Sequence, residues 1–141
     1  MMTTRALLLL FPLLAACGSS PSTPSSTGTT GTSSSTESFE VTLAPGDSTF
    51  YSFTESVPAE VTVTLASVVR PDRATPLATK MKIGMGAPAG EGCRVTDSAD
   101  ATPALTPQLT VTIAAGVHCV SIGDAGQLPG TVIASVRFTH Q

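Results

Sequence analysis

The sequence has few charged residues, and this shortage argues against a nucleic-acid partner. Charged residues make up 12% of the 141 residues, and the 7 lysine and arginine residues are scattered along the chain. Proteins that neutralise nucleic-acid phosphates gather basic side chains on one face. With a formal net charge of -3, this chain is predicted not to bind nucleic acid.

Aromatic side chains are also few. The sequence has no tryptophan and one tyrosine, whereas glycan-binding faces are built from exposed rings on which sugars stack. The aromatic residues of the strand-rich region fall mostly at alternating positions that predict a core. They are Phe39, Phe50, Tyr51, Phe53 and Phe138. The sequence therefore favours a protein partner over a glycan.

Motifs of common enzymes are missing as well. The chain contains no GxSxG, HExxH, GxGxxG or phosphate-binding loop. Its two histidines are His118, predicted to be a structural residue in a strand, and His140, predicted at a frayed end. Neither follows or precedes a recognisable nucleophile. The sequence predicts a protein that is not an enzyme and uses no cofactor.

Three carboxylates leave a metal site open as an alternative. Asp97, Asp100 and Asp124 are predicted at loop tips, where they would approach one another and bind Ca²⁺. They lack the closely spaced oxygen series of a dedicated calcium loop. Solvated turn acids are the favoured interpretation, and no metal site is predicted.

The N-terminus lacks an apolar run long enough to span a bilayer. The run over residues 6–16 has 11 residues, whereas a spanning helix needs about 20. With Arg5 before it, residues 1–16 are predicted to be a secretory signal peptide. Leu14-Ala15-Ala16-Cys17 resembles the lipobox of bacterial lipoproteins, and an ordinary signal peptide is the alternative.

The lipobox resemblance implies that Cys17 carries the lipid anchor and becomes the mature N-terminus. Because Gly18 follows it instead of aspartate, the resemblance implies the outer membrane, on its periplasmic or surface face. Residues 18–36 are all Gly, Ser, Thr or Pro, so they have no apolar side chain to bury. Residues 17–36 are therefore predicted to be a lipidated, flexible tether of a protein exported to the cell envelope.

Residues 37–141 alternate apolar and polar side chains with the period of β-strands and show no helical period. Turn residues 44–48 separate the first two strands, which are predicted to form a hairpin. Seven to eight short strands predict an all-β domain, an antiparallel β-sandwich of jelly-roll type. The predicted strands cover residues 39–43, 50–54, 61–65, 80–85, 109–113, 117–122 and 131–139.

Only two cysteines remain once Cys17 is lipidated. Exported proteins meet an oxidising compartment, so Cys93 and Cys119 are predicted to form a disulfide bond. In the chain-entropy description such a bond stabilises the fold by roughly 3 kcal/mol. A redox dithiol or half of a metal site is the alternative, but the pair lacks a CxxC spacing and a second pair of ligands.

Several segments resemble bacterial pre-peptidase C-terminal domains, which are β-sandwiches. They are LAPGDSTFYSF at residues 43–53, VTVTL at 61–65 and AGVHCV at 115–120. The chain is also similar to small export-associated lipoproteins with Gly84-Met85-Gly86 before the first cysteine of the domain and CVSIGD at residues 119–124. Both resemblances imply an exported β-sandwich, and neither implies a catalytic residue.

Two classes of function follow from these observations. The favoured one is a membrane-anchored, non-catalytic module that binds a protein partner in the envelope. The alternative is a structural or assembly accessory of an envelope complex. A carbohydrate-binding module and a hydrolase without a recognisable motif are less favoured.

Overall fold

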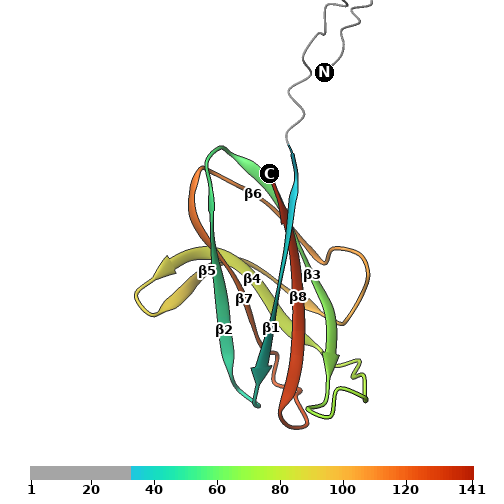
Figure 1. The fold of residues 1–141 in the computed structure, drawn as a ribbon. Helices are drawn as coiled ribbons and strands as arrows, with labels where there is room; N and C mark the ends of the chain where they lie inside the picture. The colour runs from blue at the N-terminus through green and yellow to red at the C-terminus, as the bar shows by residue number, and fades with distance from the viewer. Residues whose placement is uncertain (1–32) are drawn as a thin grey trace, which may run out of the picture. The chain divides into compact units, whose positions relative to one another are not determined.

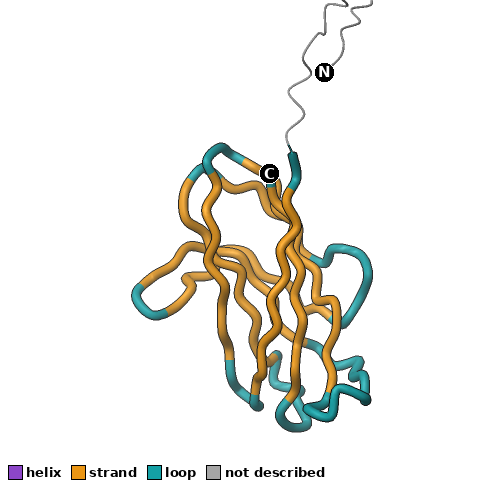
Figure 2. Tube along the Cα trace, in the orientation of Figure 1, coloured by secondary structure: helices purple, strands orange, loops and turns teal. Residues whose placement is uncertain are grey.

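The computed structural model describes residues 33–141, which form eight β-strands (Figures 1 and 2). The predictions for residues 1–32, including the signal peptide and Cys17, lie outside these residues. Residues 33–141 contain no helix that is long and apolar enough to cross a membrane. The strands are β1 (Ser35–Leu43), β2 (Ser48–Glu55), β3 (Ala59–Val69), β4 (Met81–Ala89), β5 (Gly92–Ala101), β6 (Leu109–Ile113), β7 (Gly116–Asp124) and β8 (Val132–His140).

The strands form two antiparallel sheets, which confirms the predicted β-sandwich. One sheet has the order β1-β8-β3-β6, here called sheet A, and the other has the order β2-β7-β4-β5, here called sheet B. The alternating apolar residues of both sheets point inward and pack as one core. The largest fully buried side chains of this core are Phe138, Leu43, Leu65, Met81, Ile83, Met85 and Ile122.

The predicted hairpin between the first two strands is wrong. β1 pairs with β8 along its whole length and β2 pairs with β7, so the turn after Leu43 leads from sheet A to sheet B. The turn itself is as expected, with the N–H of Asp47 donating to the carbonyl of Ala44 at 3.0 Å. Leu43 and Phe53 are both buried, because the two strands face each other across the core instead of lying side by side.

Strand β5 was not predicted from the sequence. Only Ala101 among its ten residues is buried, and the strand pairs with β4 alone at the edge of sheet B. An edge strand with one solvated face and few apolar residues has no clear period-two pattern. Its acidic residues, Asp97 and Asp100, therefore lie within a strand and not at loop tips.

The first strand begins at Ser35, so its first two residues fall in the stretch that the sequence assigns to the tether. Ser35 pairs with His140, which brings the start of β1 beside the end of β8. His140 belongs to β8 and is buried, so the prediction that it lies at a frayed end is wrong. The reason is a set of polar contacts described below.

Candidate functional site

A groove of about 660 Å³ lies on the outer face of sheet B, and we call it the sheet groove. Its walls come from segments that are far apart in the sequence. Ser48 and Phe50 of β2 stand on one side, Glu91 and Ser98 of the β4–β5 hairpin on another, and Ser121 of β7 is also part of the lining. A pocket of this size is typical of a binding site.

The groove exists because the β4–β5 hairpin curls over the sheet to which it belongs. Two outward-facing glycines of β4 leave room for this curl. A Cβ atom on Gly86 would lie 2.0 Å from the carbonyl oxygen of Arg94, and one on Gly84 would lie 2.7 Å from a methyl group of Val95. The register of β4 and β5 shifts at this point, after Met85, which increases the local twist.

A disulfide bond holds the curled hairpin in place. Cys93 of β5 is bonded to Cys119 of β7, as predicted from the cysteine count. Strand β4 lies between these two strands in sheet B, and β5 also reaches β2 across the outer face. In Figure 1 the hairpin accordingly projects beyond β2. The bond therefore fixes one wall of the sheet groove.

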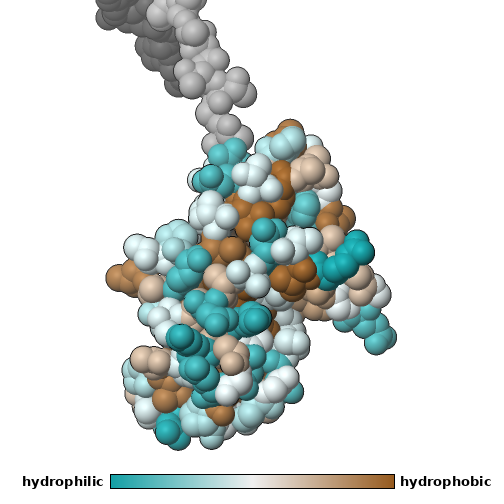
Figure 3. Space-filling model, turned by 180° about the vertical axis from the view of Figure 1, so that it is seen from behind, coloured by the Kyte–Doolittle hydropathy of each residue, from teal (hydrophilic) through white to brown (hydrophobic). Residues whose placement is uncertain are grey.

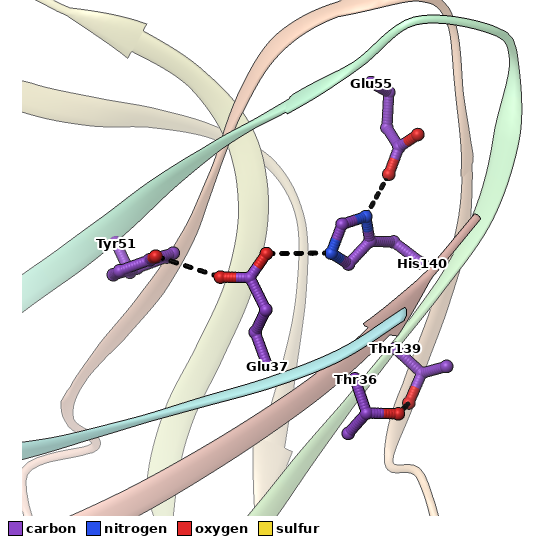
Figure 4. A network of polar contacts seen from close by, with 6 residues as sticks. All are labelled: Thr36, Glu37, Tyr51, Glu55, Thr139 and His140. Atoms are coloured by element: carbon purple, nitrogen blue, oxygen red, sulfur yellow. Dashed lines mark hydrogen bonds and ion pairs between the residues drawn. The ribbon is translucent and has the colours of Figure 1, made fainter. Parts of the chain in front are cut away.

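A second cluster of polar side chains lies where β1, β2 and β8 meet (Figure 4). The imidazole of His140 contacts two carboxylates, Glu55 through Nδ1 and Glu37 through Nε2, the latter at 3.0 Å. The Tyr51 hydroxyl donates to the other oxygen of Glu37 at 2.9 Å, and this hydrogen bond raises the pKa of Tyr51. Glu55 is only 3% exposed, so the contact with His140 is the hydrogen bond that satisfies its buried carboxylate.

Sequence reasoning missed this cluster, although a signal for it was present. Glu55 follows Tyr51 and Phe53 at inward positions of β2, and His140 follows Phe138 in the same way in β8. Period-two alternation thus places both polar residues on the core side. The rings of Phe53 and Phe138 pack against the His140 imidazole at centroid distances of 5.1 and 5.4 Å.

Asp124 is a turn residue that holds its loop together. Its Oδ1 accepts hydrogen bonds from the backbone N–H groups of Gly126, Gln127 and Leu128, and its Oδ2 accepts one from Gly46. These hydrogen bonds hold the pKa of the Asp124 carboxyl below its usual range, and the bond from Gly46 has the largest effect. The carboxylate therefore stays ionised, and Asp124 is among the residues that line the sheet groove.

The structure does not bring the three candidate metal ligands together. Asp97 and Asp100 are separated by an odd number of positions in β5 and so face opposite ways. The side chain of Asp97 accepts a hydrogen bond from Thr96, whereas Asp124 caps its own turn. Residues 33–141 contain no group of three or more His, Cys, Asp or Glu side chains able to hold a metal ion.

The remaining candidate, His118, lies in β7 and lines a small pocket together with Thr96, Asp97 and Thr112. Its Nε2 atom is 2.8 Å from the carbonyl oxygen of Ala114, and its ring tilts against Phe53. This geometry ties the turn before β7 to the strand. His118 is thus placed as a structural residue.

On the face shown in Figure 3, hydrophobic and hydrophilic residues are interspersed. Tyr51 is 39% exposed, but its ring stacks on Phe39 at 5.5 Å and lies 5.7 Å from Phe138. Tyr51 is therefore one ring of a packed aromatic cluster and not a free platform for a sugar.

Together these features define a β-sandwich of two four-stranded sheets, closed by a disulfide bond on the outer face of one sheet. No protein-family model and no curated protein matches the chain. The resemblances to bacterial lipoproteins and to pre-peptidase C-terminal domains stay predictions.

A solved structure shares the fold. PliG of Aeromonas hydrophila, a periplasmic inhibitor of g-type lysozyme, is 14% identical with a TM-score of 0.51, over 75% of this chain and 86% of that one. PliG of Salmonella Typhimurium is 13% identical with a TM-score of 0.47, over 75% of this chain and 87% of that one. At 14% identity, the likeness to the Aeromonas hydrophila protein shows the fold alone.

Proposed function

We propose that this chain is an exported, non-catalytic module that binds a protein partner. The observation that carries the proposal is the sheet groove, a pocket lined by residues of the four strands β2, β4, β5 and β7, with one wall fixed by the Cys93–Cys119 bond. A pre-formed wall reduces the conformational entropy lost on binding. The residues that line the groove include no pairing of a nucleophile with a histidine base.

The class of partner follows from the surface. A sugar site would present several free aromatic faces, whereas Tyr51 is packed against Phe39 and Phe138 and the lining of the groove contains a single ring, that of Phe50. The like-folded PliG of Aeromonas hydrophila is an inhibitor of a protein, g-type lysozyme. A lysozyme of this type is therefore the first partner to test.

We further propose that the module is held at the cell envelope by a lipid on Cys17. The support is the lipobox Leu14-Ala15-Ala16-Cys17 and the Gly, Ser, Thr and Pro composition of residues 18–36. Two or more acyl chains give stable anchoring. Replacement of Cys17 by Ala is expected to release the protein from the membrane fraction, and mass spectrometry is expected to find an acyl mass on Cys17 of the unaltered protein.

The binding proposal is tested with the mature protein purified in detergent. Calorimetry with a g-type lysozyme is expected to show a stoichiometric complex, and a cell-wall lysis assay is expected to show inhibition in proportion to the complex formed. Ovalbumin serves as the control protein. Absence of a complex overturns the lysozyme as partner, and turnover of a peptide, ester or glycan substrate by the protein itself overturns the non-catalytic function.

A further inference from the structure

The sheet groove carries an excess of negative charge. Its charged lining residues are Lys82, Glu91 and Asp124, one positive and two negative. Glu91 forms no ion pair within residues 33–141, where the ion pairs found join Arg73 to Glu40 and His140 to two glutamates. The chain as a whole also has a net charge of -3. Complementary charge steers association and selects the partner.

The walls of the groove also provide apolar surface. Phe50 of β2 and Val95 of β5 both line it, and Val95 is 42% exposed. Lysine and arginine side chains bury their aliphatic stems on such surface while the charged head remains in contact with water or a carboxylate. An arginine guanidinium also packs favourably on a phenyl ring.

Hydroxyl groups complete the lining of the groove. Ser48 and Thr49 of β2, Ser98 of β5 and Ser121 of β7 belong to it. A hydroxyl both donates and accepts hydrogen bonds, so it satisfies either the N–H or the carbonyl of a peptide backbone. The lining thus suits a polypeptide segment that brings one basic side chain.

We propose that the sheet groove binds a basic loop of the protein partner, with an arginine or lysine head at Glu91 and its stem between Phe50 and Val95. This inference rests on the proposed function, because it names the surface through which the module binds. The carboxylate of Asp124 is bound by four backbone N–H groups, so Glu91 is the carboxylate of the lining that remains to bind a cation. An acidic segment bound to Lys82 and a sugar bound to the hydroxyls are the competing occupants.

The class of occupant is tested by NMR with three probes on the full mature protein. They are the blocked tripeptides Ala-Arg-Ala and Ala-Glu-Ala and the trimer of N-acetylglucosamine. The arginine peptide alone is expected to shift the amide signals of residues 48–50, 91–98 and 121–123. No shift with this peptide, or the same shifts with the glutamate peptide or the sugar, overturns the inference.

The role of Glu91 is tested by charge reversal. Glu91→Lys is expected to abolish the shifts, whereas the matched Glu60→Lys, in β3 of sheet A, is expected to leave them unchanged. Ser98→Leu fills the groove from an exposed position and is expected to weaken peptide binding about tenfold, which is about 1.4 kcal/mol. Thr110→Leu in β6 is its control. Equal binding by Glu91→Lys and the unaltered protein contradicts the inference.

A second measurement separates this inference from the proposed function. If a g-type lysozyme binds the unaltered protein, Glu91→Lys and Ser98→Leu are both expected to weaken that complex by tenfold or more, about 1.4 kcal/mol. A complex that neither variant weakens overturns the groove as the binding surface and leaves the proposed function standing. Binding of the arginine peptide without binding of the lysozyme supports the groove and overturns that partner.

Discussion

Cys93 of β5 is bonded to Cys119 of β7 although β4 lies between these two strands in the sheet. Neighbouring strands lie about 4.8 Å apart, so strands on either side of a third are about 10 Å apart in a flat sheet. The Cα atoms of the two cysteines are 6.0 Å apart. The hairpin must therefore curl over the outer face, and the bond fixes the groove more than the core.

Removal of this bond is expected to lower the stability of the fold and to abolish binding at the groove, while the β-structure remains. Cys93→Ser combined with Cys119→Ser is expected to lower the free energy of unfolding by roughly 3 kcal/mol. The circular dichroism spectrum should remain that of a β-protein, because the core between the sheets is untouched. Binding of the arginine peptide should be lost as the hairpin swings away. An unchanged melting temperature, or two titratable thiols in the exported unaltered protein, contradicts the bond.

The glycine beneath the hairpin provides a test of the curl itself. Gly86→Ala places a methyl group against the Arg94 carbonyl, so the free energy of unfolding is expected to fall by about 2 kcal/mol, as for overpacking. Gly130→Ala is the matched control, because a Cβ there meets no atom within 4 Å. Chemical denaturation measures both variants. Equal stability of the two variants would show that β5 does not lie over Gly86.

The pKa of Tyr51 can be followed directly, because the chain has one tyrosine. The hydrogen bond to Glu37 raises this pKa above 10.0, so absorbance of tyrosinate should appear only at higher pH. Since the folded value is the higher one, this stabilisation is present below the unfolded pKa and is lost as the pH rises through the folded pKa.

Two variants of β1 test whether the contact with Glu37 causes the raised pKa of Tyr51. Glu37→Gln removes the negative charge beside the hydroxyl and should lower the pKa of Tyr51. Glu40→Gln is the control, because Glu40 pairs with Arg73 and makes no bond to Tyr51. An identical titration curve for Glu37→Gln and the unaltered protein rules out the Glu37 contact as the cause.

The buried carboxylate of Glu55 makes His140 important for stability. His140→Ala leaves this carboxylate without its partner, which is expected to cost about 3 kcal/mol in the free energy of unfolding. His118→Ala removes a histidine from a more exposed contact and should cost about 1 kcal/mol. The double variant Glu55→Leu with His140→Phe should recover most of the loss. A double variant less stable than His140→Ala alone would be inconsistent with this account.

The fold could be predicted where each strand has its own apolar face. Residues 61–65 and 131–139 alternate clearly because β3 and β8 are central strands of sheet A, with the core on one side. The pairing of β1 and β2 could not be predicted, since a hairpin and a crossing between sheets use the same turn residues. The edge strand β5 was not predicted, because only one of its residues is buried and its sequence therefore lacks the alternation of apolar and polar residues.

The candidate site was predictable only in part. The pairing of Cys93 with Cys119 follows from the number of cysteines and the exported compartment. The groove does not, because it depends on a curl that two glycines and a register shift produce in the β4–β5 hairpin, and this curl brings β5 to β2, a strand far from it in the chain. Glu55 and His140 were overlooked because polar residues next to a turn or terminus are normally solvated.

The pairing of β1 with β8 also has a mechanical consequence. The two strands are joined antiparallel from Ser35–His140 to Leu43–Val132, and their hydrogen bonds run perpendicular to the strands. A pull on the chain before Ser35, directed along β1, therefore loads these bonds together in shear instead of opening them one at a time. A domain tethered through residues 17–36, as proposed, would resist force transmitted from a partner held on sheet B.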